Sequence, residues 1–290
     1  MENLNQKLKS FFESNKKILE NNFPGLNLRT LKDSCLDYVG ESFDESQIVS
    51  VDKSNAIDFF LSRVLEGVPL SYISQKAHFY GLDFFVNESV LIPRFETELL
   101  VEECLNHIST STKNSLKLLE VGVGSGCIGL TILSEVKDKS IEFVGTDISN
   151  AAIDIANKNR QKLEFKISKN AEVKFLLSDR LDEVLDKRFD VIVSNPPYIK
   201  SKQDKELVHN QVLKYEPEVA LFLNDEIYDS WFEQLFEQAQ TCLSDDGLFL
   251  MEGHENHLER LKELAEKRKF KNIIIKNDLT GRLRFLVMRK

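Results

Sequence analysis

Hydrophobic residues follow two different spacings along the chain, and the spacing changes after about residue 115. Residues 57–65 place an apolar side chain every three or four positions, as one face of a helix does, and Gly67 and Pro69 follow as helix breakers. We therefore predict a small helical domain over residues 1–75. The aromatic and β-branched run HFYGLDFFV then turns about Gly81, which predicts a β-hairpin, and residues 76–95 are taken as the linker.

From about residue 115, short apolar runs alternate with helical stretches. The runs are KLLEVGV, IEFVGTDI, VKFLLSD, FDVIVSN, GLFLMEG, NIIIKN and RLRFLVM. Such alternation predicts an α/β fold, with helices packed on a mostly parallel sheet, over residues 96–290. Only DLTG separates the last two runs, which is too short for a parallel crossover, so these strands should form a C-terminal antiparallel hairpin.

Composition narrows the classes of function. The 290 residues suit two domains, and 42% apolar with 29% charged residues argues against extensive disorder. The net charge of −9 disfavours a nucleic-acid partner, because a phosphate backbone would be repelled. No apolar run approaches the roughly 20 residues of a membrane span, so no membrane partner and a cytoplasmic location are expected. The four cysteines lie far apart and are expected to be reduced.

A glycine-rich turn follows the first strand of the α/β region. It comprises Gly122, Val123, Gly124, Ser125 and Gly126. Glycines let such a turn form and let a ligand approach the backbone at the carboxyl end of a strand, where open α/β sheets bind ligands. Because Gly124, Gly126 and Gly129 also satisfy GxGxxG, the turn by itself fits a nicotinamide cofactor, S-adenosylmethionine, or no ligand at all.

Three acidic residues at strand ends are candidates for the same ligand. Asp147 suits two ribose hydroxyls, the alternative being a helix N-cap, for which Ser149 and Asn150 are better placed. Asp179 would accept from an adenine amino group or cap the next helix. Glu120 would face a cationic amino group and sulfonium, or else bind nearby backbone amides.

The fourth predicted strand of this region ends in Asn195, Pro196, Pro197 and Tyr198. The Asn195 oxygen and the Pro196 carbonyl can each accept one N–H of a target NH₂, which aims a poorly nucleophilic nitrogen at a methyl group. Proline limits the freedom of the loop, and Tyr198 can stack on a planar amide. The alternative is an ordinary Asn-Pro turn. Together with the glycine turn, the motif favours S-adenosylmethionine over a nicotinamide.

These motifs resemble class I methyltransferases with an Asn-Pro-Pro-Tyr motif, and specifically the release-factor glutamine methyltransferases, often called HemK-like. The stretches GVPLSYISQKAHFYGLDFFVNESVLIPRFETELLVE and YEPEVAL extend the resemblance over nearly the whole chain. It implies a Rossmann-like sheet of seven strands, an N-terminal helical substrate-recognition domain and a hairpin linker. It also implies methyl transfer to the glutamine of the Gly-Gly-Gln tripeptide of class 1 peptide-chain release factors, with S-adenosylhomocysteine as the second product.

The resemblance further implies which residues bind each substrate. Those matched to the cofactor are Glu120, Gly122, Val123, Gly124, Ser125, Gly126, Asp147, Asp179, Arg180 and Asn195. Those matched to the glutamine are Asn195, Pro196, Pro197 and Tyr198. The chain departs from the family pattern at Glu120, where Asp is usual, at Phe95, which interrupts Pro-Arg-Pro, and at Arg180, where an aromatic residue often covers the adenine.

The sequence leaves two alternative functions and one candidate metal site to be considered. A DNA adenine methyltransferase would need a basic cleft, which the acidic balance does not favour, and a non-catalytic cofactor-binding protein has no use for the Asn195 acceptor pair. His254 and His257 lack HExxH spacing and an evident third ligand, so they are expected to be solvated, and no metal is expected. We expect a monomer.

Overall fold

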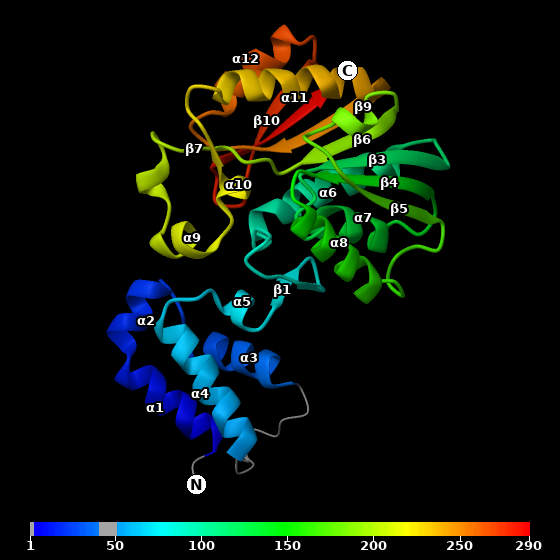
Figure 1. Cartoon of the computed structure of the whole chain (residues 1–290). Coiled ribbons are helices and arrows are strands. Elements are labelled where there is room, and N and C mark those ends of the chain that lie inside the picture. The colour runs from blue at the N-terminus through cyan, green and yellow to red at the C-terminus, as the bar shows by residue number, and fades with distance from the viewer. Residues whose placement is uncertain (1–2, 41–50) are drawn as a thin grey trace.

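The catalytic part of the chain is built on one twisted sheet of seven strands in the order β10-β11-β9-β6-β3-β4-β5 (Figure 1). The computed structural model describes residues 3–40 and 51–290. The strands of this sheet are β3 (Ser115–Val121), β4 (Ser140–Asp147), β5 (Ala171–Leu177), β6 (Phe189–Ser194), β9 (Leu243–Glu252), β10 (Lys271–Asn277) and β11 (Leu283–Arg289). All seven apolar runs form strands, which confirms the predicted α/β fold.

Strand directions also follow the prediction. The pairs β3–β4, β3–β6, β4–β5 and β6–β9 are parallel, whereas β11 is antiparallel to both β9 and β10. The strand β11 lies between β9 and β10, although it follows both in the chain. The parallel strands bring their carboxyl ends to one edge of the sheet, where a ligand crevice is expected.

Helices cover both faces of the sheet. In Figure 1, α6, α7 and α8 lie on one face and α11 and α12 on the other. Their bounds are α6 (Phe95–Thr110), α7 (Cys127–Glu135), α8 (Asn150–Lys162), α11 (Tyr228–Cys242) and α12 (Leu258–Lys267). Neighbouring residues of a strand enter opposite cores: Val191 packs with the α6 and α7 side, and Ile192 with the α11 and α12 side. Burial on both faces explains the continuous apolar runs.

The first part of the described chain is helical. Its helices are α1 (Leu4–Ser14), α2 (Lys16–Asn22), α3 (Leu28–Val39), α4 (Val51–Leu65) and α5 (Leu70–Ile73). The predicted stripe on α4 is buried, with Ile57, Phe60 and Val64 all 0% exposed. Hydrophobic side chains of these helices share a core with Val86, Val90 and residues of α8. That this part recognises the substrate, and the domain limits at residues 75 and 95, stay predictions.

A short hairpin follows these helices. The strands β1 (Lys76–Phe79) and β2 (Leu82–Phe85) are antiparallel, and Tyr80 and Gly81 form the turn with φ of 49° and 71°. Positive φ at both central residues is the two-residue turn geometry that hairpins favour. Asn159 of α8 joins this hairpin to the glycine turn: it accepts from the Phe85 N–H (2.6 Å) and donates to the Phe85 and Ser125 carbonyls (both 2.9 Å).

Between β6 and α11 the chain forms a small substructure that the hydrophobic pattern does not predict. Its elements are β7 (Ile199–Lys200), α9 (Asn210–Tyr215), α10 (Glu218–Leu221) and β8 (Phe222–Leu223), with β7 and β8 paired in parallel. Two-residue strands are too short to leave a periodic signal. This substructure borders the carboxyl edge of the sheet.

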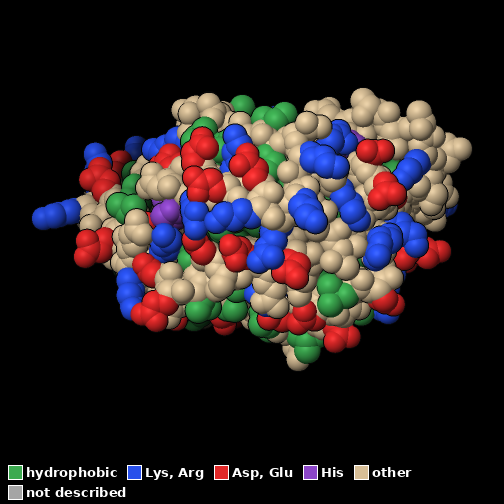
Figure 2. Space-filling view, turned by 90° about the horizontal axis from the view of Figure 1, so that it is seen from above, with side chains coloured by type: hydrophobic (Ala, Val, Ile, Leu, Met, Phe, Trp, Pro, Cys, Tyr) green, Lys and Arg blue, Asp and Glu red, His purple; other side chains and the backbone are tan. Residues whose placement is uncertain are grey.

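The surface carries both signs of charge. Figure 2 shows the face seen from above, where basic and acidic side chains are interspersed. Among the described residues, no helix combines the length and apolar character needed to cross a membrane. All four cysteines are free thiols, and Cys35, Cys104 and Cys242 are buried.

Candidate active site

The glycine turn brings backbone close to a cavity at the carboxyl edge of the sheet. Gly122 and Gly124 have φ of 74° and 52°, in the left-handed region that residues with a Cβ rarely adopt. The N–H groups of Gly122 and Val123 donate to the Thr146 carbonyl at 2.8 and 2.9 Å, which fixes the turn against β4. Gly126 then begins α7 as its N-cap.

Asp147 lies at the end of β4 and faces the same cavity. One carboxylate oxygen accepts from the Gly124 N–H and the other from the Ser149 N–H, both at 2.9 Å. A carboxylate has about four acceptor sites, so each oxygen keeps capacity for a hydroxyl. Burial raises the pKa of Asp147. The alternative role as a helix cap is wrong, because Ser149 caps α8 by accepting from the Ala152 N–H.

Glu120, the penultimate residue of β3, is 1% exposed and borders the cavity. Its Oε2 accepts from the Gly129 N–H at 2.9 Å, so the expected contact with a backbone amide exists. Burial raises its pKa well above the ordinary value, an effect that the hydrogen bond opposes and the charge of Asp147 reinforces. A cationic group in the cavity would favour the ionised form.

The Arg180 guanidinium and the Trp231 indole form another wall of the cavity. The Arg180 side chain is 8% exposed, contacts the Asp179 carboxylate at 3.0 Å, and lies 5.2 Å over the Trp231 ring. Its Nε is buried without a hydrogen-bond partner in the described part of the chain. Asp179 does not cap the following turn, since Ser178 accepts from the Glu183 N–H. Sequence reasoning missed Trp231, which reaches the cavity from α11.

The Asn-Pro-Pro-Tyr loop follows β6 and lies opposite the glycine turn. A Cβ placed on Gly122 would come within 3.9 Å of the Asn195 carbonyl oxygen, so the two loops approach closely. The Asn195 side chain donates from Nδ2 to Thr97 Oγ1 at 3.2 Å. Pro196 and Pro197 also line the cavity. Tyr198 lies behind it, and its hydroxyl donates to Glu252 Oε1 at 2.8 Å.

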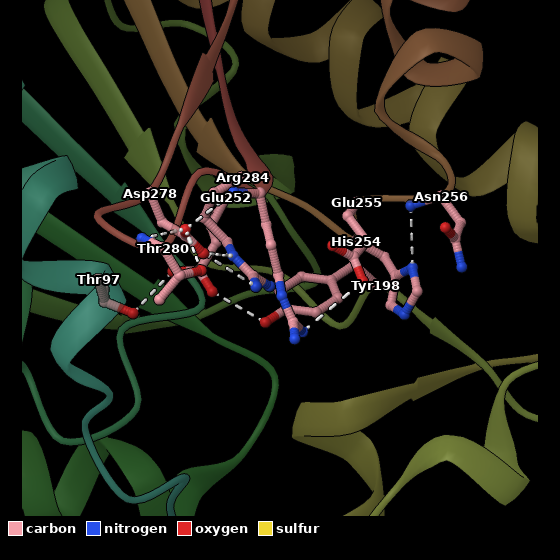
Figure 3. Close-up of polar contacts among 10 residues, drawn as sticks. Thr97, Tyr198, Glu252, His254, Glu255, Asn256, Asp278, Thr280 and Arg284 are labelled. Atoms are coloured by element: carbon pink, nitrogen blue, oxygen red, sulfur yellow. Dashed lines mark hydrogen bonds and ion pairs between the residues drawn. The ribbon is translucent and has the colours of Figure 1, made fainter.

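Thr97 and Glu252 support this loop and were not found from the sequence (Figure 3). Thr97, in the first turn of α6, is 2% exposed, and Glu252, the last residue of β9, is 1% exposed. The Thr97 hydroxyl donates to Glu252 Oε2 at 2.7 Å. Burial raises the pKa of Glu252, and hydrogen bonds from Thr97 and Tyr198 oppose the rise. Burial, the charge of Glu252 and its hydrogen bond raise the pKa of Tyr198.

The segment before α6 closes the cavity on a further side. Arg94 donates to Glu216 Oε1 at 2.6 Å, and the other oxygen of Glu216 accepts from the Ile92 N–H at 3.2 Å. Glu98, in the first turn of α6, accepts from the Tyr80 N–H of the hairpin at 2.8 Å. The stretches PRFETE and YEPEVAL therefore meet through Arg94 and Glu216, a pairing that sequence reasoning did not make.

The prediction of solvated histidines is wrong for His257. Its side chain is 7% exposed, and its Nε2 lies 2.7 Å from Asp204 Oδ2. His254 completes a group whose three possible metal-ligand atoms lie within 4.8 Å of one another. Asp204 was missed as the third member because it lies 50 residues before His254 in the chain. The absence of a metal cofactor stays a prediction.

The cavity thus gathers most of the residues that the motifs singled out. Those that line it are Glu120, Gly122, Val123, Gly124, Ser125, Asp147, Asp179, Arg180, Asn195, Pro196 and Pro197. Gly126 and Tyr198 do not line it. The unsatisfied Arg180 Nε, the free acceptor capacity of Asp147 and the open backbone at Gly124, where a Cβ would meet nothing within 4 Å, fit an adenosine-containing ligand.

Comparison with known proteins agrees with this arrangement. Residues 95–220 match the family model "Methyltransferase small domain". The hMettl16 catalytic domain, solved in complex with the MAT2A 3'UTR hairpin 1, is 13% identical and superposes with a TM-score of 0.56 over 92% of each chain. A T. thermophilus 16S rRNA methyltransferase in complex with AdoMet and guanosine is 17% identical, with a TM-score of 0.52 over 74% of this chain and 49% of the other. These likenesses show the fold alone.

Sequence relatives are more specific. The release factor glutamine methyltransferase of Flavobacterium psychrophilum is 36% identical over 228 residues, which are 78% of this chain and 77% of the relative. Identity at this level, over most of both chains, is shared with relatives of the same name from other bacteria. The chain belongs to the family of release factor glutamine methyltransferases.

Proposed function

We propose that this protein transfers a methyl group from S-adenosylmethionine to the side-chain amide nitrogen of the glutamine in the Gly-Gly-Gln tripeptide of class 1 release factors. Membership of the family supports the substrate, and the cavity at the carboxyl edge of the sheet supports the cofactor. The observation that carries the chemistry is the orientation of Asn195, whose nitrogen bonds to Thr97 so that its oxygen is left for another donor.

S-adenosylmethionine would supply an electrophilic methyl group bonded to a sulfonium. The reaction forms a bond from the amide nitrogen to the methyl carbon, breaks the carbon–sulfur bond with its electron pair left on sulfur, and releases one proton from nitrogen. An amide nitrogen is a weak nucleophile, so positioning must provide much of the acceleration. The Asn195 oxygen and the Pro196 carbonyl would accept the two N–H bonds of the glutamine and stabilise positive charge as it develops.

Each of several residues around the cavity is proposed to bind a different part of the cofactor or of the glutamine. Asp147 would accept from the ribose hydroxyls, and the ionised Glu120 would attract the cationic end of the cofactor. The Arg180 guanidinium would stack on the adenine, in place of the aromatic residue that is usual in the family, since guanidinium planes pack on aromatic faces. Tyr198 does not line the cavity, so its stacking on the planar amide stays a prediction, while its hydroxyl bond to Glu252 holds the end of the loop. The cytoplasmic location and the monomeric state stay predictions.

Mass spectrometry of a purified class 1 release factor tests the proposal. The factor is incubated with this protein and S-adenosylmethionine, beside a factor in which the tripeptide glutamine is replaced by alanine, and beside duplex DNA. One added methyl group on the unaltered factor alone is the expected result. Methyl transfer to DNA would instead indicate an adenine methyltransferase, and cofactor binding without any transfer would indicate a binding protein.

Asn195→Ala is the matched test of the mechanism. Turnover should fall about 10²-fold or more, because an acceptor aimed at the reacting nitrogen is lost. Cofactor affinity, measured by calorimetry, should largely survive, since Asp147 and the glycine turn are unchanged. Near-normal turnover in this variant would refute the role given to Asn195.

A further inference from the structure

A buried carboxylate lies directly behind the Asn-Pro-Pro-Tyr loop. Glu252 ends β9, beside β6 in the sheet, and its two oxygens have different partners (Figure 3). Oε2 accepts from the Thr97 hydroxyl at 2.7 Å and Oε1 accepts from the Tyr198 hydroxyl at 2.8 Å. Glu252 does not line the cavity, so it has no role in binding either substrate in the proposed reaction.

The single proton of the Thr97 hydroxyl decides which way the Asn195 amide lies. An ionised carboxylate only accepts hydrogen bonds, so the Thr97 proton must point to Glu252. Toward Asn195 the hydroxyl then offers lone pairs alone, and the Asn195 nitrogen, not its oxygen, must face it. The 3.2 Å contact from Asn195 Nδ2 to Thr97 Oγ1 is the bond that this polarity requires.

We propose that Glu252 is a positioning residue that acts through the Thr97 hydroxyl to hold the Asn195 amide with its oxygen available to the target NH₂. In the reversed orientation, Asn195 would present N–H groups to the N–H groups of the glutamine, and the acceptor would be lost. The inference rests on the proposed function, because that function supplies the NH₂ group. It adds a residue that never touches either substrate.

The second hydrogen bond ties the other end of the loop to the same carboxylate. Asn195 and Tyr198 bracket the two prolines, and both are held by Glu252, one through Thr97 and one directly. Arg284 lies nearby and is paired with Asp278 at 3.3 Å. Its positive charge joins the two hydroxyl donors in opposing the effect of burial on the Glu252 pKa. Burial still leaves the pKa of Glu252 raised, but both of its oxygens accept from hydroxyls, which is the bonding pattern of the carboxylate on which the polarity depends.

Single-residue variants separate this role from a merely structural one. In Glu252→Gln the side chain can donate as well as accept, so the Thr97 proton is free to turn toward Asn195 and the amide can reverse. In Thr97→Val the link is removed. For both variants we expect kcat to fall by about 10- to 100-fold, the range for a misplaced reacting group, with the Kd of S-adenosylhomocysteine unchanged by calorimetry.

Three further variants sharpen the comparison. Thr97→Ser keeps the hydroxyl and should restore most of the turnover lost in Thr97→Val. Thr131→Val is the matched control, because the Thr131 hydroxyl is buried without a hydrogen-bond partner in the described chain and should be dispensable. In Thr97→Val, replacing Glu252 by Gln as well should cost little more, since residues acting in one chain are not additive. Additive losses, or full kcat in either single variant, would overturn the proposal.

An NMR measurement tests the orientation without turnover. With ¹⁵N in the asparagine side chains, the Asn195 NH₂ signal is assigned by its loss in Asn195→Ala. We expect the signal to shift in Thr97→Val and in Glu252→Gln, and to keep its position in Thr131→Val. An unmoved signal in the first two variants would overturn the inference. Failure of the wild-type protein to methylate a release factor would refute the proposed function alone, since the NMR comparison still decides how Asn195 lies.

Discussion

Asn159 offers a quantitative test of how the linker and the cofactor loop are joined. Its side chain is 0% exposed and makes three hydrogen bonds, two to the backbone of Phe85 in the hairpin and one to the Ser125 carbonyl in the glycine turn. Asn159→Ala removes all three at once. Because no water can easily reach the site, the backbone groups are left without partners.

The size of the effect follows from the count of bonds. A buried backbone group left without a partner costs about 1–3 kcal/mol, so with three such bonds lost the free energy of unfolding should fall by at least about 3 kcal/mol. For 290 residues the entropy of unfolding is about 0.6 kcal/mol/K, from roughly 2.1 cal/mol/K for each residue, so Tm should fall by at least about 5 °C. Cofactor affinity should also fall, because Ser125 loses its anchor.

The assay is urea denaturation followed by circular dichroism, with hydrogen exchange at the Phe85 amide. The matched control is Asn157→Ala on the same helix, because within the described residues the Asn157 side chain donates to the Ile153 carbonyl one turn away and to no other group. It should cost less than about 1 kcal/mol, the net value of one such bond. If Asn159→Ala costs no more than this control, or if exchange at Phe85 is unchanged, the three-way junction does not stabilise the fold as argued.

Three other substitutions test the cavity walls. Asp147→Asn places an NH₂ group against one of two backbone N–H donors, so calorimetry should show cofactor affinity reduced by about 10-fold or more, and unchanged affinity would contradict its role. Burial raises the pKa of Glu120, so the folded protein holds a proton that the unfolded chain loses near its ordinary value of 4.5. Unfolding free energy measured against pH should therefore fall as pH rises from that value through the folded pKa, and Glu120→Gln should make this fall smaller, the remainder coming from Asp147 and Glu252, whose pKa values burial also raises; an identical slope in the variant would refute the assignment. Gly129→Ala would place a Cβ 2.2 Å from Phe143 Cζ and 2.7 Å from Glu120 Oε2, so urea denaturation should show a loss of about 1–3 kcal/mol, and a neutral effect would show that the ring moves freely.

The parts of the structure that were predictable are those with a local signal. Each strand of the sheet is an apolar run of adjacent residues, and the glycine turn and the Asn195 loop sit at strand ends, where the order of a parallel sheet brings them together. Thr97 and Glu252 carry no such signal. They lie 155 residues apart, and nothing in either local sequence indicates that one hydroxyl would bridge β9 to the Asn195 amide.

The lack of a local signal also explains why the burial of His257 and the role of Trp231 were not predicted from the sequence. His257 reads as a polar residue before an amphipathic helix, and only the turn after β7 brings Asp204 against it. Trp231 reads as one more apolar residue of α11, whereas its ring supports Arg180. In both cases the contact joins residues far apart in the chain, Asp204 with His257 and Arg180 with Trp231, so no local periodicity indicates it.

The placement of β11 between β9 and β10 has a consequence for biosynthesis. The ribosome makes β9 and β10 before β11, yet in the finished sheet β9 and β10 are not neighbours, and β11 pairs with both. Until residues 283–289 have been synthesised, each of the two strands has an edge without its partner, and such edges invite pairing with other chains. The nascent protein is therefore prone to aggregate for as long as β9 and β10 are present without β11.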